Sequence, residues 1–324
     1  MRLGCAPGTS QCRSELCHGS QIRPGPQRVE SHLKVLRIPS LPVASLLVGA
    51  SLWGVVWHPY RLLGAAGLDG AWASALTYGV ALLVGTSVFL GHWRDVSRAP
   101  WTCLAMGLAI GGSNLAYVIG VLEGEVMRVL LLFYLAPLWT VPLAHFLLNE
   151  RLDARGALVM AVALAGAAVM LWHPEMGLPW PASRAEWLGV VAGFFFALGN
   201  VLVRSLAGLR DTTKSLAIWA GVTVAAILYL PWSPTTTPAA IAAAAVTWPI
   251  WLSVGFALLA MSLALQYGLS RIPANRAIVI LLFELVVAAI ASYWLAGEIM
   301  RTQDWIGGSL SVAASLASGL RKEG

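Results

Sequence analysis

Charged residues are scarce in this chain, and that scarcity excludes a water-soluble globular protein. Asp, Glu, Lys and Arg make up 11% of the 324 residues, whereas hydrophobic residues make up 58%. An ordinary soluble domain carries roughly 25% charged residues. The charges also cluster, and they leave apolar runs of about 18–22 residues, the length that crosses a hydrocarbon core of roughly 30 Å. The composition therefore predicts an all-α membrane protein with many transmembrane helices.

The sequence also lacks the motifs of catalysis and of nucleotide binding. It contains no GxxxxGK[ST] run, no HExxH and no GxSxG, which excludes the common phosphate-binding loop, zinc-protease helix and nucleophile elbow. Its net charge of +6 is not arranged as a basic stripe interleaved with aromatic residues, so nucleic acid is not an expected partner. We expect no enzyme and no cofactor, and active transport would have to draw on an ion gradient or on the gradient of the substrate.

Disulfides and metal sites are not expected either. Cys5, Cys12 and Cys17 lie near the N-terminus and Cys103 lies in an apolar run. Their spacing matches no zinc pattern, so free thiols are the simpler interpretation. Residues 1–40 are polar and basic and lack the apolar stretch of a signal peptide, and we expect them to form a disordered cytoplasmic tail.

Ten apolar segments follow this tail, and each is long enough to span the bilayer. They are 41–62, 71–91, 100–121, 127–149, 155–172, 185–206, 214–232, 247–270, 275–297 and 303–320. With the N-terminus inside, 17 Lys and Arg residues fall on the cytoplasmic side and four fall on the opposite side. This positive-inside bias predicts an even number of spans with both termini in the cytoplasm.

A weak internal repeat appears at an offset of 148 residues, where residues 112–150 align with 260–298 without a gap. The aligned charges are the most informative, because Arg128 and Glu150 fall on Arg276 and Glu298. In each copy the Arg and the Glu are 22 residues apart, which is about 33 Å of helix and one membrane crossing. The match indicates that the two halves share one fold.

The repeat also predicts the orientation of the two halves. Five spans per half is an odd number, so the second half would enter the membrane upside down. We therefore expect ten transmembrane helices as two inverted five-helix repeats, residues 41–172 and 185–320. Inverted repeats around a midplane site are the construction of many secondary transporters.

Several segments resemble EamA-type transporters of the drug/metabolite transporter superfamily. They are Leu131-Leu132-Phe133-Tyr134-Leu135-Ala136-Pro137-Leu138-Trp139, Leu147-Leu148-Asn149-Glu150-Arg151-Leu152, Trp53-Gly54, Ala197-Leu198-Gly199-Asn200 and Trp294-Leu295-Ala296-Gly297-Glu298. The resemblance covers roughly residues 41–320. It implies ten helices, cytoplasmic termini, a central cavity between the halves and alternating access in the bacterial inner membrane. The second copy departs from the signature, since Glu284 and Leu285 stand where the first copy has Ala136 and Pro137.

Glu284 is the first candidate for a substrate or coupling site. Of the 15 acidic residues it alone lies in the middle of a span. An unpaired charge at that depth costs roughly 2.5–3.5 kcal/mol on insertion scales. The side chain should therefore find a partner, face a wet cavity or take up a proton, and each outcome suits a coupling or substrate site. The alternative is a neutral carboxylic acid tied to a neighbouring helix.

The other candidates are prolines, arginines and polar side chains within the spans. Pro137 removes a backbone donor and can open a helix toward a cavity, or it can be a packing kink. Arg128 and Arg276 could attract an anionic group or pair with Glu284, or they could snorkel to the interface. Asn114, Tyr117, Tyr134, Asn200 and Gln266 could line a cavity or make interhelical hydrogen bonds. We expect Glu150 and Glu298 to fix helix ends, with pairing to Arg across the repeat interface as the alternative.

These features favour a secondary transporter of small organic metabolites, amino-acid-like compounds or drugs. The resemblance suggests export, and the energy would come from protons acting through Glu284. The expected partners are a small-molecule substrate, protons and the lipid bilayer, and the sequence leaves a homodimer open. The alternative function is a non-transporting membrane sensor or assembly protein that keeps the fold. A channel is disfavoured because no ring-forming filter sequence appears.

Overall fold

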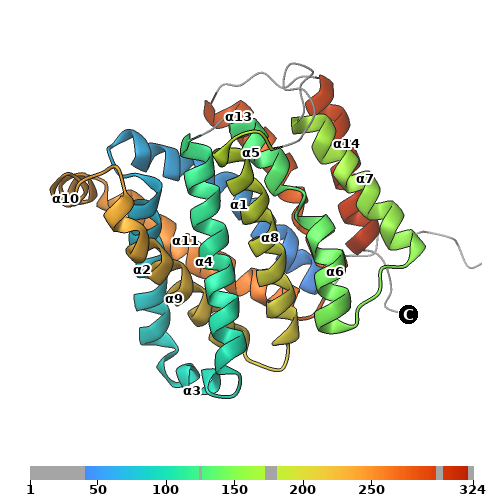
Figure 1. Ribbon diagram of the computed structural model, residues 1–324, viewed down its shortest axis with the longest axis horizontal. Helices are drawn as coiled ribbons and strands as arrows, with labels where there is room; N and C mark the ends of the chain where they lie inside the picture. The colour runs from blue at the N-terminus through green and yellow to red at the C-terminus, as the bar shows by residue number, and fades with distance from the viewer. Residues whose placement is uncertain (1–40, 124–125, 172–180, 297–301, 320–324) are drawn as a thin grey trace, which may run out of the picture. The chain divides into compact units, whose positions relative to one another are not determined.

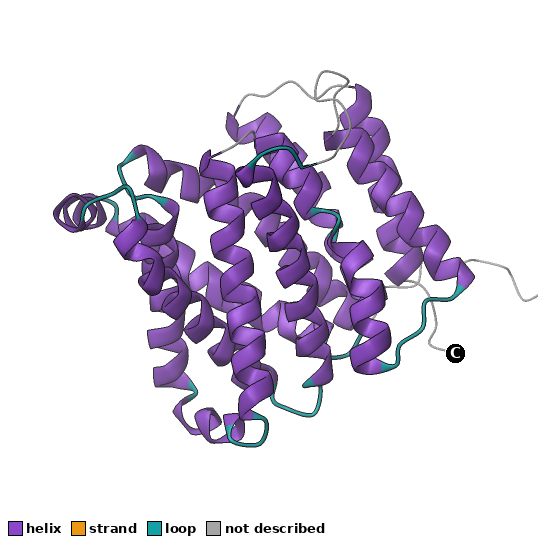
Figure 2. Cartoon of the chain, viewed as in Figure 1, coloured by secondary structure: helices purple, strands orange, loops and turns teal. Residues whose placement is uncertain are grey.

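The computed structural model describes residues 41–123, 126–171, 181–296 and 302–319, which belong to one unit, Ile38–Gly324. All regular structure in these ranges is helical, and they contain no strand (Figures 1 and 2). The expected tail, 1–40, and the charges Glu298 and Arg301 lie outside the described residues.

Each predicted apolar segment of the first half begins within one residue of the start of a helix. The helices are α1 Leu41–Ala65, α2 Gly70–Val88, α3 Trp93–Val96, α4 Pro100–Glu123, α5 Val126–Phe133, α6 Ala136–Leu148 and α7 Ala154–Leu171, with a short 3-10 turn η1 at Leu90–His92. The small helix α3 was not expected. It lies in the connection after α2 and places Asp95 beside Arg98 and Arg210, at 3.3 Å and 3.5 Å.

The helices of the second half occur in a corresponding order along the chain. They are α8 Arg184–Ser205, α9 Asp211–Tyr229, α10 Thr237–Val246, α11 Trp248–Leu269, α12 Ala274–Leu281, α13 Phe283–Ala296 and α14 Thr302–Gly319, with η3 at Leu230–Trp232. The additional helix α10 is alanine-rich and has Pro238 in its first turn, a combination that favours helix formation. Its ten residues span only about 15 Å, too short to cross a bilayer.

Eight segments of the described chain are long and apolar enough to cross a membrane. The ten spans expected from the sequence are therefore not all recovered, because the apolar stretches of α7 and α14 cover only Ala154–Val169 and Trp305–Ser318. Both are shorter than the roughly 20 residues of a typical span. The structure thus supports a multi-pass helical membrane protein.

Two expected spans, 127–149 and 275–297, are each divided into two helices. Between α5 and α6, Pro137 lacks the N–H that would bond to the carbonyl of Phe133, and a short non-helical segment results (Figure 2). No proline explains the second break, between α12 and α13. There the turn at Leu282 is closed by the shorter bond from Leu285 N to the Leu282 carbonyl at 3.1 Å.

Close approach of a neighbouring helix accompanies both breaks. A Cβ added at Gly54 of α1 would lie 2.7 Å from the Glu284 carbonyl oxygen. A Cβ added at Gly193 of α8 would lie 2.6 Å from the Phe133 carbonyl oxygen. Only glycine therefore lets α1 and α8 pack directly against the two broken helices.

Helix contacts are reciprocal between the two halves. Helix α1 packs on α11 and α13, and its counterpart α8 packs on α4, α5 and α6. Helices α2 and α9 pack on each other, as do α7 and α14, which lie side by side in Figure 1. The bounds of α12 and α14 also equal those of α5 and α7 shifted by 148 residues. The broken helices therefore occupy matching places in the two halves.

The counterpart helices α2 and α9 run in opposite directions. Asp69 at the start of α2 bonds to Ser233, which follows the end of α9. At the other end, Thr213 in the first turn of α9 donates to the carbonyl of His92, just beyond α2, at 3.3 Å. This arrangement requires α2 and α9 to be antiparallel.

Asp69 is expected to stabilise the connection between the α1–α2 loop and the segment after α9. It accepts hydrogen bonds from the backbone of Ala71 and Trp72, at 2.8 Å and 3.2 Å, and from Ser233 and Thr235. We expect Asp69→Ala to lower the unfolding free energy by about 1–2 kcal/mol, because it removes a helix N-cap together with these links. Thermal or denaturant unfolding of the detergent-solubilised protein would measure the loss.

The same residue should give stability a pH dependence. Burial opposes ionisation of Asp69, but its hydrogen bonds outweigh that effect and lower its pKa below the ordinary value. A lowered pKa stabilises the fold above the unfolded-state value, and the contribution is lost as the pH falls through the folded-state value. We expect the wild type to lose this contribution below about pH 4, and Asp69→Asn to lack this component of the acid sensitivity. An equal acid sensitivity of both proteins would contradict the assignment.

Candidate functional site

A cavity lies between the two halves at the level of the broken helices. It encloses about 120 Å³, well above the roughly 15 Å³ needed for one water molecule. Its walls come from α1, α2, α4, α5, α8, α9, α11, α12 and α13. Six of the sequence-predicted residues line it, namely Asn114, Tyr117, Tyr134, Asn200, Gln266 and Glu284.

Glu284 and Tyr134 join the two breaks across this cavity. Glu284 lies in the first turn of α13, and Tyr134 lies in the non-helical segment between α5 and α6. The Tyr134 hydroxyl donates to Glu284 Oε1 at 2.8 Å. A carboxylate in the first turn is also favoured by the N-terminal end of the helix dipole. The carboxyl group therefore has a defined partner from the other half and a surface on the cavity.

Aromatic rings form a large part of the wall. The Phe133 ring lies 5.4 Å from Tyr117, 5.3 Å from Tyr134 and 5.3 Å from Phe196, measured between ring centroids. Trp53 also lines the cavity, as does Tyr78. Sequence reasoning did not single out Trp53 as a site residue, nor Tyr78, Phe133 or Phe196, because aromatic residues in apolar spans look the same whether they face a core, lipid or a cavity.

Three amide side chains add to the polarity of the wall. Asn114 accepts a hydrogen bond from Ser74 at 3.0 Å. By contrast, Asn200 Nδ2 and Gln266 Oε1 are buried without a partner among the described residues. Buried polar atoms are nearly always hydrogen-bonded. One unpartnered donor and one unpartnered acceptor in the cavity wall are therefore suited to contacts with water or a bound molecule.

Pro137 and Arg276 are not among the described residues that line the cavity. Pro137 is buried in the first turn of α6, where it ends the break. Arg276, on α12, donates through Nε to the Ser318 carbonyl at 2.8 Å, which is a contact between α12 and the C-terminal end of α14. Arg128 belongs to α5, and its side chain falls outside what the structure describes.

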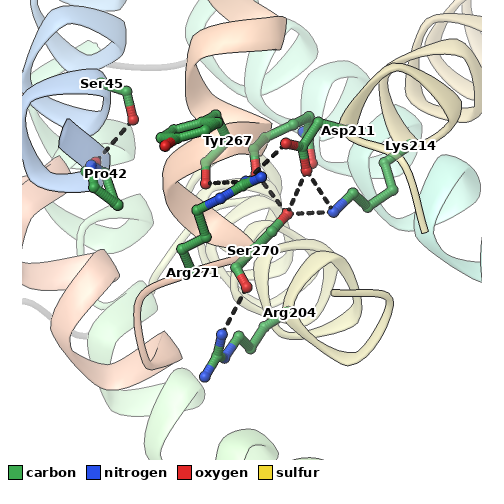
Figure 3. A network of polar contacts seen from close by, with 9 residues as sticks. Pro42, Ser45, Arg204, Asp211, Lys214, Tyr267, Ser270 and Arg271 are labelled. Carbon is green, nitrogen blue, oxygen red and sulfur yellow. Dashed lines mark hydrogen bonds and ion pairs between the residues drawn. The ribbon is translucent and has the colours of Figure 1, made fainter. Parts of the chain in front are cut away.

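A polar cluster at one end of the bundle was not predicted. We call Glu150, Arg204, Asp211, Lys214, Ser270 and Arg271 the end cluster (Figure 3 shows all of these except Glu150). Asp211 lies 2.9 Å from Lys214 Nζ and 2.7 Å from Arg271 Nη1, and it accepts from Ser270 at 2.9 Å. Lys214 is fully buried, and Asp211 is its counter-ion.

Glu150 extends the end cluster to the first half. Its two oxygens contact Arg204 Nε at 3.2 Å and the backbone N–H of Ala274 at 2.8 Å. Arg204 in turn donates to the Ser270 carbonyl at 2.6 Å. The pairing across halves, which the sequence offered as the alternative for Glu150, is present. Because Leu269 lines the cavity and Ser270 follows it directly, the end cluster lies just beyond one end of the cavity.

The fold and the cavity define a multi-pass helical membrane protein with a polar and aromatic chamber between two related halves. The chain matches the EamA-like transporter family over residues 41–172 and 183–319. It belongs to this family, as the sequence resemblance predicted.

Individual relatives agree with the family match. The chain is 25% identical over 225 residues to an uncharacterized transporter of Archaeoglobus fulgidus, covering 69% of this chain and 78% of the relative. It is 35% identical over 94 residues to an uncharacterized transporter of Pseudomonas aeruginosa, covering 28% of this chain and 31% of the relative. A solved structure described as "Crystal structure of protein" superposes with a TM-score of 0.68 at 18% identity, over 87% of this chain and 98% of that one, and it shows the fold alone. The family and the relatives support a transporter role with a small-molecule substrate in a lipid environment.

Proposed function

We propose that this protein is a secondary transporter that exports small organic metabolites or drugs by alternating access. The observation that carries the proposal is the meeting of two broken helices, one from each half, at a cavity that contains Glu284. Discontinuous helices in corresponding places mark the binding sites of many secondary transporters. In the proposed cycle, residues 41–172 and 185–320 are inverted five-helix repeats that rock around this cavity.

The end cluster is the proposed gate on the cytoplasmic side. The reciprocal contacts and the antiparallel α2–α9 pair support inverted halves. The excess of Lys and Arg on one side supports cytoplasmic termini in a bacterial inner membrane. That side includes Arg204, Lys214 and Arg271, so opening toward the cytoplasm would require the end cluster to separate. The cavity is formed by one chain, so this cycle requires no second copy.

Proton coupling is assigned to Glu284. Among the described residues, the other titratable groups lining the cavity are Tyr78, Tyr117 and Tyr134. These phenols ordinarily titrate near pH 10, far above a carboxyl group. Glu284 is therefore the group in the wall that could exchange a proton and a substrate within one transport cycle.

A non-transporting membrane protein with a closed cavity is the second candidate. The hydrogen bond between Tyr134 and Glu284 favours it, since a fixed partner is what a purely structural carboxyl would have. The two functions differ in water access. A carrier must hydrate its cavity in at least one state, whereas a closed structural cavity would stay protected.

Cysteine accessibility tests this distinction. In a protein whose native cysteines are replaced by serine, we expect Ser262→Cys to react with a membrane-impermeant thiol reagent, because Ser262 lines the cavity. Ala260→Cys is the matched control on the same helix and at nearly the same depth, but it lies on the exposed face that would contact lipid. We expect it to stay unreactive. Equal protection of both positions would support the non-transporting alternative and would overturn the carrier proposal.

A further inference from the structure

We infer that the cavity selects small organic cations with an aromatic or apolar body, and that it discriminates against carboxylates and zwitterions. This inference rests on the proposed function and specifies its substrate class. The residues that carry it are Glu284, Tyr134 and the rings of Trp53, Tyr117, Phe133 and Phe196.

The charges of the cavity wall favour a cationic ligand. The described residues lining the cavity include one carboxyl group and no Lys, Arg or His. The basic residues of the end cluster are already engaged by Asp211 and Glu150. A ligand cation would therefore find a counter-ion in Glu284, and no basic group among the described residues of this wall would repel it. A ligand carboxylate would lose its hydration and would meet no basic partner among the same described residues.

The aromatic rings of the cavity wall also favour a cationic ligand. Tyr117, Tyr134 and Phe196 surround Phe133 at centroid distances of 5.3–5.4 Å, and Trp53 faces the same cavity. Ring faces attract ammonium groups, most strongly where water is excluded. Aromatic walls around a single carboxylate therefore complement an ammonium group attached to an aromatic or apolar body.

The hydrogen-bonding groups of the cavity wall suit the same ligand. Tyr134 donates to Oε1 of Glu284, and it is the residue that the structure shows bonded to this carboxyl within the described chain. Glu284 Oε2 is therefore available to an ammonium donor. Asn200 Nδ2 is a buried donor without a described partner, but it is neutral and cannot replace a basic residue for a carboxylate. It and Gln266 Oε1 suit a neutral polar substituent on the same ligand.

Binding calorimetry on the purified wild-type protein tests the inference with four matched probes. They are 2-phenylethylamine, benzyltrimethylammonium, the neutral 2-phenylethanol and the zwitterion phenylalanine. We expect both cations to bind at least tenfold more tightly than the alcohol or phenylalanine. The quaternary ion has no N–H, so its binding would show that charge and ring contacts suffice.

Two variants separate a charge effect from damage to the fold. Glu284→Gln should weaken binding of the amine to the level of 2-phenylethanol and leave binding of the alcohol unchanged. Glu186→Gln is the control, because Glu186 is also a buried glutamate but lies in the first turn of α8, outside the cavity wall. It should keep the preference for cations.

Three results would overturn the inference. They are equal binding of phenylalanine and 2-phenylethylamine, equal binding of the amine and the alcohol, and no binding of any probe to the wild type. The transporter proposal would survive each of them if Ser262→Cys still reacts with the impermeant reagent, because water access does not depend on the substrate class. If the calorimetry gives one of these three results and Ser262→Cys is also unreactive, both the substrate class and the transporter proposal are contradicted.

Discussion

Glu284→Gln is expected to abolish the effect of a pH gradient on transport in proteoliposomes. Benzyltrimethylammonium is a suitable probe, because its permanent charge keeps it from crossing lipid or following a pH gradient by itself. We expect an opposed pH gradient to accelerate its flux through the wild type at least tenfold. The variant should show the same low flux with and without the gradient, since a glutamine cannot release a proton and cannot neutralise a bound cation.

Two further variants make this result specific. Glu284→Asp keeps a carboxyl group but shortens it by one methylene, so it should retain part of the response. Glu186→Gln removes a buried carboxyl group outside the cavity and should respond like the wild type. Equal gradient-driven flux in the wild type and Glu284→Gln would end the proposal of proton coupling, although not that of transport.

Asp211→Asn is expected to lower the unfolding free energy by about 3–5 kcal/mol, the usual cost of leaving a buried charge without its partner. Lys214 has no exposed surface and lies 2.9 Å from Asp211. The substitution also removes the charge that faces Arg271 at 2.7 Å. Three basic side chains, those of Arg204, Lys214 and Arg271, would then share the end cluster with Glu150 alone. Denaturant titration of the purified protein in detergent would measure the loss.

The double variant Asp211→Asn/Lys214→Met should recover most of that stability, because it removes the buried cation together with its partner. Arg184→Ala is a control, because the Arg184–Glu123 pair is 3.4 Å apart with side chains 75% and 38% exposed. Exposed pairs contribute about 0–1 kcal/mol. A loss no greater for Asp211→Asn than for Arg184→Ala would show that the end cluster does not hold this end of the bundle together.

The sequence by itself determined the class of the protein and named six of the residues that line its cavity. Apolar length and the positions of charges are local properties, and they located the membrane helices because each helix satisfies its own backbone hydrogen bonds. The offset of 148 residues indicated two related halves, and the family model matches residues 41–172 and 183–319. A carboxyl group in mid-span is costly wherever it occurs, so Glu284 could be named before any helix was placed.

The tertiary structure decided which side chains meet. Tyr134 and Glu284 are 150 residues apart, and no local pattern predicts their hydrogen bond. The break at Leu282 has no proline and coincides with the close packing of Gly54 against the Glu284 carbonyl. The end cluster joins the ends of α6, α8, α9, α11 and α12. Such contacts depend on how separate helices pack, which the hydrophobicity of any single helix leaves undetermined.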